Sequence, residues 1–169
     1  MTDLVLPELV IDVTPTFVVA SAIATRDFQD VHHDRDRAVE RGSKDIFINI
    51  LTTTGLVQRY VTDWAGPQAL VRTVAIRLGV PCYAGDTLTF SGQVAAEGAD
   101  GEVEVTVTGR CSLGDHVTGT VRLVLPPGGR GLASWVNQTT GYRPSNGSFI
   151  DSDQEAAGVR GADGAGETA

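Results

Sequence analysis

The segment from Thr25 to Asp34 carries the residues best suited to chemistry in this chain. Its sequence, TRDFQDVHHD, places a carboxylate at position 27 and an imidazole at position 32. Five residues apart, these side chains would diverge on one helix or point to opposite faces of one strand. We therefore expect an irregular loop that turns Asp27 and His32 toward one cavity, where they can hold a water and move a proton. Such a pair can add water to an activated carbon chain or remove it.

A metal site is the competing interpretation of this loop. The adjacent imidazoles of His32 and His33 point apart, and the chain shows no ligand spacing typical of zinc proteins. The cysteines, Cys82 and Cys111, form no CxxC motif and make no disulfide framework. We therefore expect no metal ion and interpret both cysteines as free thiols in a reducing cytoplasm.

One substantial helix is predicted over residues 49–64. Asn49 is a suitable N-cap, and Gly66-Pro67 ends the helix. Apolar residues fall on more than one side of it, which is typical of a helix wrapped by other structure, and Gly55 would let a sheet approach closely. The first amides after Asn49 lie at the positive end of the helix dipole and can stabilise a developing oxyanion.

Segments of β character lie on both sides of this helix. Before the loop we expect an extended arm over residues 9–13 and a strand over residues 17–24, and after it a charged helix over residues 34–41 that Gly42 ends. Beyond the central helix, turn residues separate four apolar segments that we expect to form an antiparallel meander. These are residues 71–80, 87–95, 102–113 and 116–125. A long helix wrapped by such a sheet is the α+β hot-dog fold, whose open edge a second hot-dog subunit would cover.

Length, composition and charge limit the fold and its partners. Of 169 residues, we expect residues 1–126 to form one domain and residues 127–169, rich in glycine and acidic residues, to form a largely disordered or partner-docking tail. The net charge of −8 argues against sequence-independent nucleic-acid binding, which needs a basic surface. We identify no signal peptide and no membrane span, so we expect a cytoplasmic protein without a membrane partner.

Residues 26–32 resemble the hydratase signature of MaoC-like (R)-specific enoyl-CoA hydratases, G-D-x-N-P-[IL]-H. The resemblance implies that Asp27 and His32 are the catalytic pair, and residues 85–88 are similar to the family's G-D-T-L turn. This chain departs from the signature at its glycine, asparagine and proline. Those positions hold Arg26, Gln29 and Asp30.

Hydration of an enoyl thioester requires an activated water at C3, a proton for C2 and a stabilised enolate oxygen. We expect Asp27 to act as the base on water and His32 to share that water and transfer the proton, although the pair could titrate as a unit with the roles exchanged. The resemblance places the family's oxyanion site at the backbone amides of Asn49 and Ile50, where Ile48-Asn49 replaces the usual His-Gly. No cofactor is implied, because the CoA thioester is the substrate.

Longer runs resemble the small subunits of actinobacterial steroid side-chain enoyl-CoA hydratases, a branch of the same family. The runs are residues 32–36, 42–47, 49–52 and 54–67. The resemblance implies a cholesterol-derived enoyl-CoA substrate and a heterotetramer with a larger MaoC-like subunit. It also implies that the small subunit carries the catalytic pair.

Two other functions remain open. A hot-dog thioesterase would also bind an acyl-CoA, but its acid lies on the central helix, where this chain has only Gln58 and Asp63 near the far end. A non-catalytic subunit that completes a partner's acyl-CoA pocket is favoured by the altered signature and opposed by the intact Asp27/His32 pair.

The remaining polar residues receive simpler interpretations. We expect His33 to fix the loop by a hydrogen bond, His116 to be a hairpin residue and Asp86 to stabilise a turn. Three arginines are candidates for contacts with the CoA phosphates, although arginines on strands are mostly solvated. They are Arg72, Arg77 and Arg110.

Overall fold

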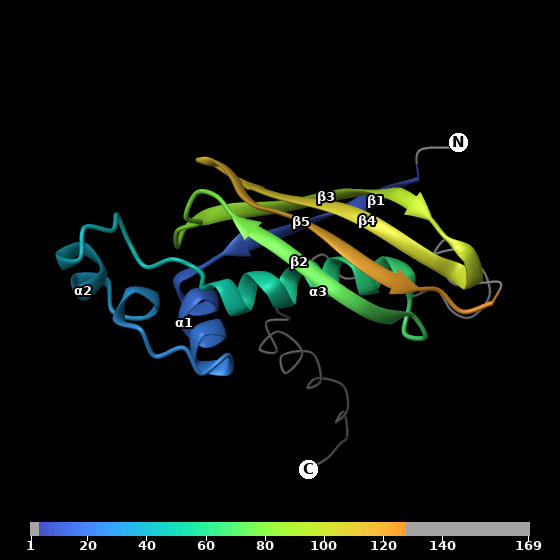
Figure 1. Ribbon diagram of the computed structural model, residues 1–169. Coiled ribbons are helices and arrows are strands. Elements are labelled where there is room, and N and C mark those ends of the chain that lie inside the picture. Colours follow the sequence, from blue (N-terminus) through green and yellow to red (C-terminus); the bar gives the residue numbers. More distant parts are fainter. Residues whose placement is uncertain (1–3, 128–169) are drawn as a thin grey trace, which may run out of the picture.

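The computed structural model describes residues 4–127 of the protein, and its strands form one five-stranded antiparallel sheet (Figure 1). The strands are β1 (Val5–Val13), β2 (Leu70–Leu78), β3 (Asp86–Glu97), β4 (Glu102–Cys111) and β5 (Gly114–Val124). The helices are α1 (Pro15–Ala24), α2 (Arg35–Glu40) and α3 (Ile50–Ala65), with short 3-10 turns η1 (Asp30–His32) and η2 (Ala99–Gly101). The expected tail over residues 127–169 lies outside the described residues except for its first residue.

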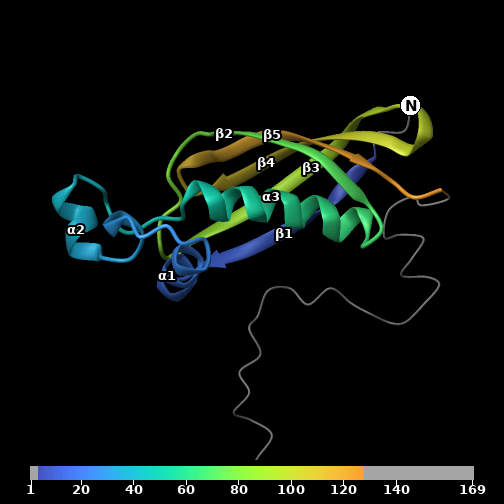
Figure 2. The ribbon, with the colours of Figure 1, turned by 60° about the horizontal axis from the view of Figure 1, so that its bottom comes forward.

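Helix α3 crosses one face of the sheet, and α1 and α2 lie beyond the end of the sheet near the start of α3 (Figures 1 and 2). This confirms the predicted hot-dog arrangement of a long helix on a curved sheet. Val57 and Val61 of α3 are fully buried, and Tyr60 stacks on Phe90 of β3 with the ring centroids 5.8 Å apart. No helix in the described residues is long and apolar enough to cross a membrane.

The predicted ends of α3 are confirmed. Asn49 caps the helix, because its Oδ1 accepts a hydrogen bond from the Thr52 amide at 2.8 Å. Gly66 follows the helix with φ +87°, in the left-handed region that favours glycine. The expected role of Gly55 is wrong, because Gly55 is exposed and a Cβ there would meet nothing within 4 Å. The close approach occurs instead at Gly92 of β3.

The prediction of a strand over residues 17–24 is wrong, because this segment belongs to helix α1. Its β-branched and apolar composition suggested a strand, but the residues just before it start a helix. Thr14 accepts a hydrogen bond from the Phe17 amide at 3.0 Å, and Pro15 occupies the first turn. Val18 and Ala22, four residues apart, are buried, so the apolar pattern serves one face of a helix. The charged helix expected over residues 34–41 is confirmed as α2.

The predicted strands exist, but their order differs from a simple four-stranded meander. Only β3, β4 and β5 follow one another in space as they do along the chain. Strand β2 pairs with β5, and β1, expected as a mere arm, pairs with β3 over the length of the sheet. Both β1 and β2 are therefore edge strands. The local patterns identified the strands, whereas the pairing of β2 depends on distant partners.

Candidate active site

Asp27 and His32 approach each other at the end of α1, as the sequence predicts. The Asp27 amide donates to the Ala22 carbonyl at 2.9 Å, which turns the chain away from the helix, and His32 lies in the η1 turn. His32 Nε2 lies 3.5 Å from Asp27 Oδ2. The side chains keep 9 % and 19 % of their surface exposed, respectively, so the pair is shielded but reachable. The catalytic role of the two residues stays a prediction at this stage.

Backbone geometry explains why the MaoC-like signature begins with glycine. Arg26, which stands in the glycine position, has φ +56°, in the left-handed region. This conformation aims Asp27 back toward the start of α3. The altered residue therefore keeps the loop geometry at a cost in backbone strain.

The orientation of the His32 ring is fixed from its far side. Nδ1 lies 2.8 Å from the Phe47 carbonyl oxygen, which can only accept, so Nδ1 carries a proton and donates it. The Phe47 ring packs edge-on against the imidazole, with the centroids 4.9 Å apart. In the neutral imidazole, Nε2 therefore presents its lone pair to Asp27.

Asn49 supplies a contact that sequence reasoning missed. We predicted its backbone amide as an oxyanion site, but its side chain contacts the pair. Nδ2 donates to Asp27 Oδ2 at 2.9 Å and to Thr25 Oγ1 at 2.8 Å. Its N-cap character was visible in the sequence, but no local signal showed that it would meet a carboxylate 22 residues earlier.

The start of α3 therefore lies beside the Asp27/His32 pair. The Asn49, Ile50 and Leu51 amides donate to no acceptor in the part of the chain that the structure describes. Free amides at the positive end of a helix dipole are suited to a carbonyl oxygen that becomes negative. The assignment of Asn49 and Ile50 as the oxyanion site remains a prediction, and both backbone amides are available for it.

The other histidines have structural contacts. His33 Nε2 lies 3.3 Å from the Phe28 carbonyl oxygen, a contact within the loop that agrees with its expected role. His116 lies just after the β4–β5 hairpin but is buried, with Nε2 2.9 Å from Thr53 Oγ1 of α3. Burial lowers the pKa of His116, although the Val80 carbonyl bonded to Nδ1 opposes this shift. His116 thus joins the sheet to α3.

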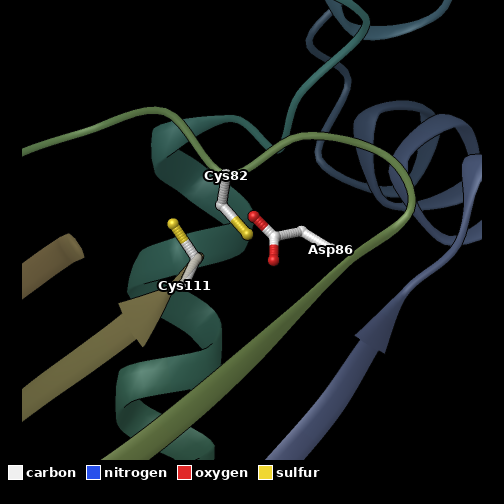
Figure 3. A group of neighbouring side chains, drawn as sticks. All are labelled: Cys82, Asp86 and Cys111. Atoms are coloured by element: carbon white, nitrogen blue, oxygen red, sulfur yellow. The ribbon is translucent and has the colours of Figure 1, made fainter. Parts of the chain in front are cut away.

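The fold brings Cys82, Asp86 and Cys111 together, although their sequence spacing gave no sign of a cluster (Figure 3). One ligand-type atom from each lies within 4.8 Å of the others, and the Cys82 thiol points toward the Asp86 carboxylate. Burial, and then the neighbouring Cys111, raise the pKa of the Cys82 thiol well above its usual range. The raised pKa favours the thiol form of Cys82, whereas a bound metal would need its thiolate.

Asp86 has the turn role that we expected. Its carboxylate accepts from the Thr87 amide at 2.8 Å and from the Ser112 hydroxyl at 2.8 Å. Burial acts to raise the pKa of Asp86, but these hydrogen bonds outweigh it and the pKa is lowered. The carboxylate therefore ties the start of β3 to the β4–β5 hairpin.

In the described residues, no hydrogen bond or ion pair joins the arginines proposed for CoA to Asp27 or His32. Arg110 forms an ion pair with Asp115 at 2.8 Å across the β4–β5 hairpin. Arg72 and Arg77 are exposed on β2, and Arg77 borders an open hollow of about 450 Å³ over β2, β4 and β5. This hollow contains neither Asp27 nor His32.

Solved structures of low identity share this fold. The (R)-hydratase from A. caviae involved in PHA biosynthesis is 20% identical, covers 71% of this chain and 93% of its own, and superimposes with a TM-score of 0.66. A MaoC-like dehydratase is 21% identical with a TM-score of 0.68, over 75% of this chain and 41% of its own. These similarities define the class of the fold, the hot-dog fold of MaoC-like hydratases. No family model matches the chain.

Closer relatives define the family. The chain is 68% identical, over 119 residues, to the 3-oxo-4,17-pregnadiene-20-carboxyl-CoA hydratase beta subunit of Mycobacterium tuberculosis (strain ATCC 25618 / H37Rv), covering 70% of this chain and 92% of the relative. It is 65% identical to a chain in the crystal structure of the ChsH1-ChsH2 complex from Mycobacterium tuberculosis, with a TM-score of 0.72 over 75% of this chain and 100% of that chain. The protein belongs to the MaoC-like hydratase family that includes this beta subunit.

Proposed function

We propose that this protein is the catalytic subunit of an enoyl-CoA hydratase, which adds water across the 2,3 double bond of a steroid side-chain enoyl-CoA. One observation carries the proposal. Nε2 of His32 lies 3.5 Å from Asp27 Oδ2 beside the free amides of α3, and the bond from Nδ1 to the Phe47 carbonyl fixes the imidazole ring. When the imidazole is neutral, both Nε2 and the carboxylate accept hydrogen bonds, and a water lying against the pair can donate one hydrogen to each.

A water that donates one hydrogen to His32 and one to Asp27 keeps its oxygen lone pairs free. Those lone pairs face outward, toward C3 of an enoyl thioester placed over the pair. The Ile50 amide would then donate to the thioester oxygen, which becomes an enolate oxygen when the C3–O bond forms. The proposed substrate position thus depends on two groups, the water held by the pair and the amides at the start of α3.

Asp27 and His32 together account for every proton that moves in the reaction. Asp27 takes one proton from the attacking water as its oxygen bonds to C3 and the double-bond electrons move to the thioester oxygen. The protonated Asp27 passes this proton to Nε2 of His32, which lies 3.5 Å from Oδ2. His32, which shares the water, then delivers the proton from Nε2 to C2 as the enolate collapses. A 3-hydroxyacyl-CoA results, and the pair ends as it began.

The steroid acyl group and the assembly are proposed from the relative's name and from exposed surface. Edge strand β2 has a neighbour on one side only, and Leu70 at its start is half exposed. Ile50 and Leu51, beside the pair, are half exposed as well. A larger MaoC-like subunit that pairs with this chain would cover such surfaces and complete the acyl pocket.

The thioesterase alternative finds less support. Of its two candidates on α3, Asp63 is 56 % exposed and forms an ion pair with Arg59 at 3.3 Å. The non-catalytic alternative predicts instead that the partner carries a working Asp/His pair of its own.

The decisive experiment is co-expression with the larger subunit, followed by measurement of steroid enoyl-CoA hydration. We expect Asp27→Asn and His32→Ala each to lower kcat by ~10²–10⁴-fold while the complex still assembles. The assembly is checked by size-exclusion chromatography with light scattering. Native activity in both variants would show that the chemistry belongs to the partner and that this chain completes its pocket.

A further inference from the structure

We propose that the Asn49 side chain is a positioning residue for the hydration: it orients Asp27 and fixes the distance between the proton-transfer pair and the amides of α3. The inference rests on the proposed function but adds a residue and a role to it. The Asn49 residue is buried, with 3 % of its surface exposed, and every polar atom of its carboxamide has a hydrogen-bond partner.

The direction of these hydrogen bonds is fixed by chemistry. The Thr52 amide can only donate, so it must face Asn49 Oδ1 at 2.8 Å. The amino group then has to face Asp27 Oδ2 and Thr25 Oγ1. A flipped carboxamide would place its NH₂ against an N–H and its oxygen against a carboxylate, and both contacts would be repulsive.

Asn49 and His32 therefore approach the same carboxylate oxygen of Asp27. Among the described residues, the other oxygen, Oδ1, accepts a hydrogen bond from the Gln29 amide alone, at a longer 3.3 Å. With Oδ2 held by Nδ2, rotation of the carboxylate away from His32 would leave a buried N–H without an acceptor. Leaving such a group unpaired is costly, so Asn49 keeps the Asp27 carboxylate turned toward His32.

Thr25 anchors the same network to the end of α1. Its hydroxyl donates to the Ser21 carbonyl at 2.8 Å and accepts the second hydrogen of the Asn49 amino group. One carboxamide thus joins the end of α1, the catalytic loop and the first turn of α3. Because the oxygen of the same carboxamide caps α3, the position of the free Ile50 amide and the position of Asp27 are set together. A displacement of ~1 Å in such a geometry can cost ~10²-fold in rate.

Substitutions at Asn49 separate positioning from capping. Asn49→Asp and Asn49→Ser both keep an N-cap oxygen, but neither offers the amino group to Asp27. We expect kcat of the complex to fall by ~10²-fold in each, with KM within a few-fold of native. Tm should change little in Asn49→Ser and fall in Asn49→Asp, whose buried carboxylate would face that of Asp27. Asn49→Ser adds no charge, so a loss shared by both variants cannot come from charge repulsion. Asn49→Ala should lower both kcat and Tm.

A matched control removes a cap elsewhere. Thr14→Ala deletes the N-cap of α1 without touching the pair, and we expect it to lower Tm while kcat stays native. Native kcat in both Asn49→Asp and Asn49→Ser would overturn the inference and leave Asn49 as a cap only. If Asp27→Asn is inactive in the same assay, the proposed function stands even when the inference about Asn49 fails. If Asp27→Asn is active, the proposed function itself is overturned.

Should the Asn49 variants not assemble, Thr25→Val decides the question. It leaves Asn49 and its cap in place and removes one acceptor of the amino group. A fall in kcat with unchanged KM supports the positioning role, and native kcat overturns it.

Discussion

At the scale of single residues, the loop that carries the pair holds strain at one backbone position. Arg26 adopts φ +56° with a full side chain, directly before Asp27. A residue with a Cβ pays about 1–2 kcal/mol for this conformation, and glycine does not. Glycine loses more chain entropy on folding, which offsets part of that gain, about 0.5–1 kcal/mol.

We therefore expect Arg26→Gly to raise the free energy of unfolding by about 0.5–1 kcal/mol. Urea unfolding of the two proteins under the same conditions measures the difference. Arg26→Ala is the matched control, because it removes the same charge but keeps a Cβ. Equal stabilities of the glycine and alanine variants would show that the charge, and not the backbone, determines the effect.

At the scale of elements, the helix–sheet contact depends on a glycine in the sheet. A Cβ at Gly92 of β3 would lie 2.7 Å from the Thr106 carbonyl oxygen and 3.0 Å from Cε1 of Tyr60, which is buried in α3. The first distance is shorter than real Cβ contacts, and the second would require the Tyr60 ring to shift by a few tenths of an ångström. The spacing between α3 and the centre of the sheet is thus set at this position.

We expect Gly92→Ala to lower the free energy of unfolding by ~1–3 kcal/mol, because a buried methyl group has no room. Gly55→Ala provides the opposite case, since a Cβ there meets nothing within 4 Å and glycine is unfavourable inside a helix. That variant should gain about 0.5–1 kcal/mol. Thermal unfolding of Gly92→Ala and Gly55→Ala tests both expectations, and destabilisation by both substitutions would contradict the contact geometry.

The features that can be predicted from the sequence are those whose residue pattern lies within one short segment of the chain. Helix α3 was predictable because its cap, its apolar pattern and its stop all lie within it. The meeting of Asp27 and His32 was predictable because they lie five residues apart in one irregular segment and match the hydratase signature. The β-branched and apolar composition of helix α1 is typical of a strand, and only Thr14 and Pro15 mark it as a helix. The Asn49 contact and the pairing of β2 with β5 were beyond reach, since both join segments that are distant along the chain.

At the scale of the whole molecule, the sheet of the described residues has two edge strands. Strand β1 borders β3, and strand β2 borders β5. Both edges carry half-exposed apolar residues, Leu70 on β2 and Val10 on β1, with 51% and 50% exposed. Exposed edges of this kind are pairing sites unless they are covered. The hetero-oligomer that we propose needs one of them.

We expect Leu70→Lys with Leu78→Lys on β2 to weaken assembly with the larger subunit by at least ~10-fold in Kd, because buried lysines disfavour edge pairing. Val10→Lys tests the other edge, and Leu113→Lys, 52% exposed in the β4–β5 hairpin, is the surface control. Light scattering of the co-purified complexes measures assembly. A larger loss with Val10→Lys would place the partner on β1 instead.

The loop from Thr25 to His32 joins both proton-transfer groups within eight residues of a single chain. Under the proposed function, the bond-making machinery is inherited as one contiguous segment, while the walls that recognise the acyl group can be encoded by another gene. A partner subunit can then diverge to accept a new side chain without any compensating change at Asp27 or His32. Substrate range and catalytic competence would evolve independently, and exchange of the larger subunit would be the natural way to redirect this enzyme.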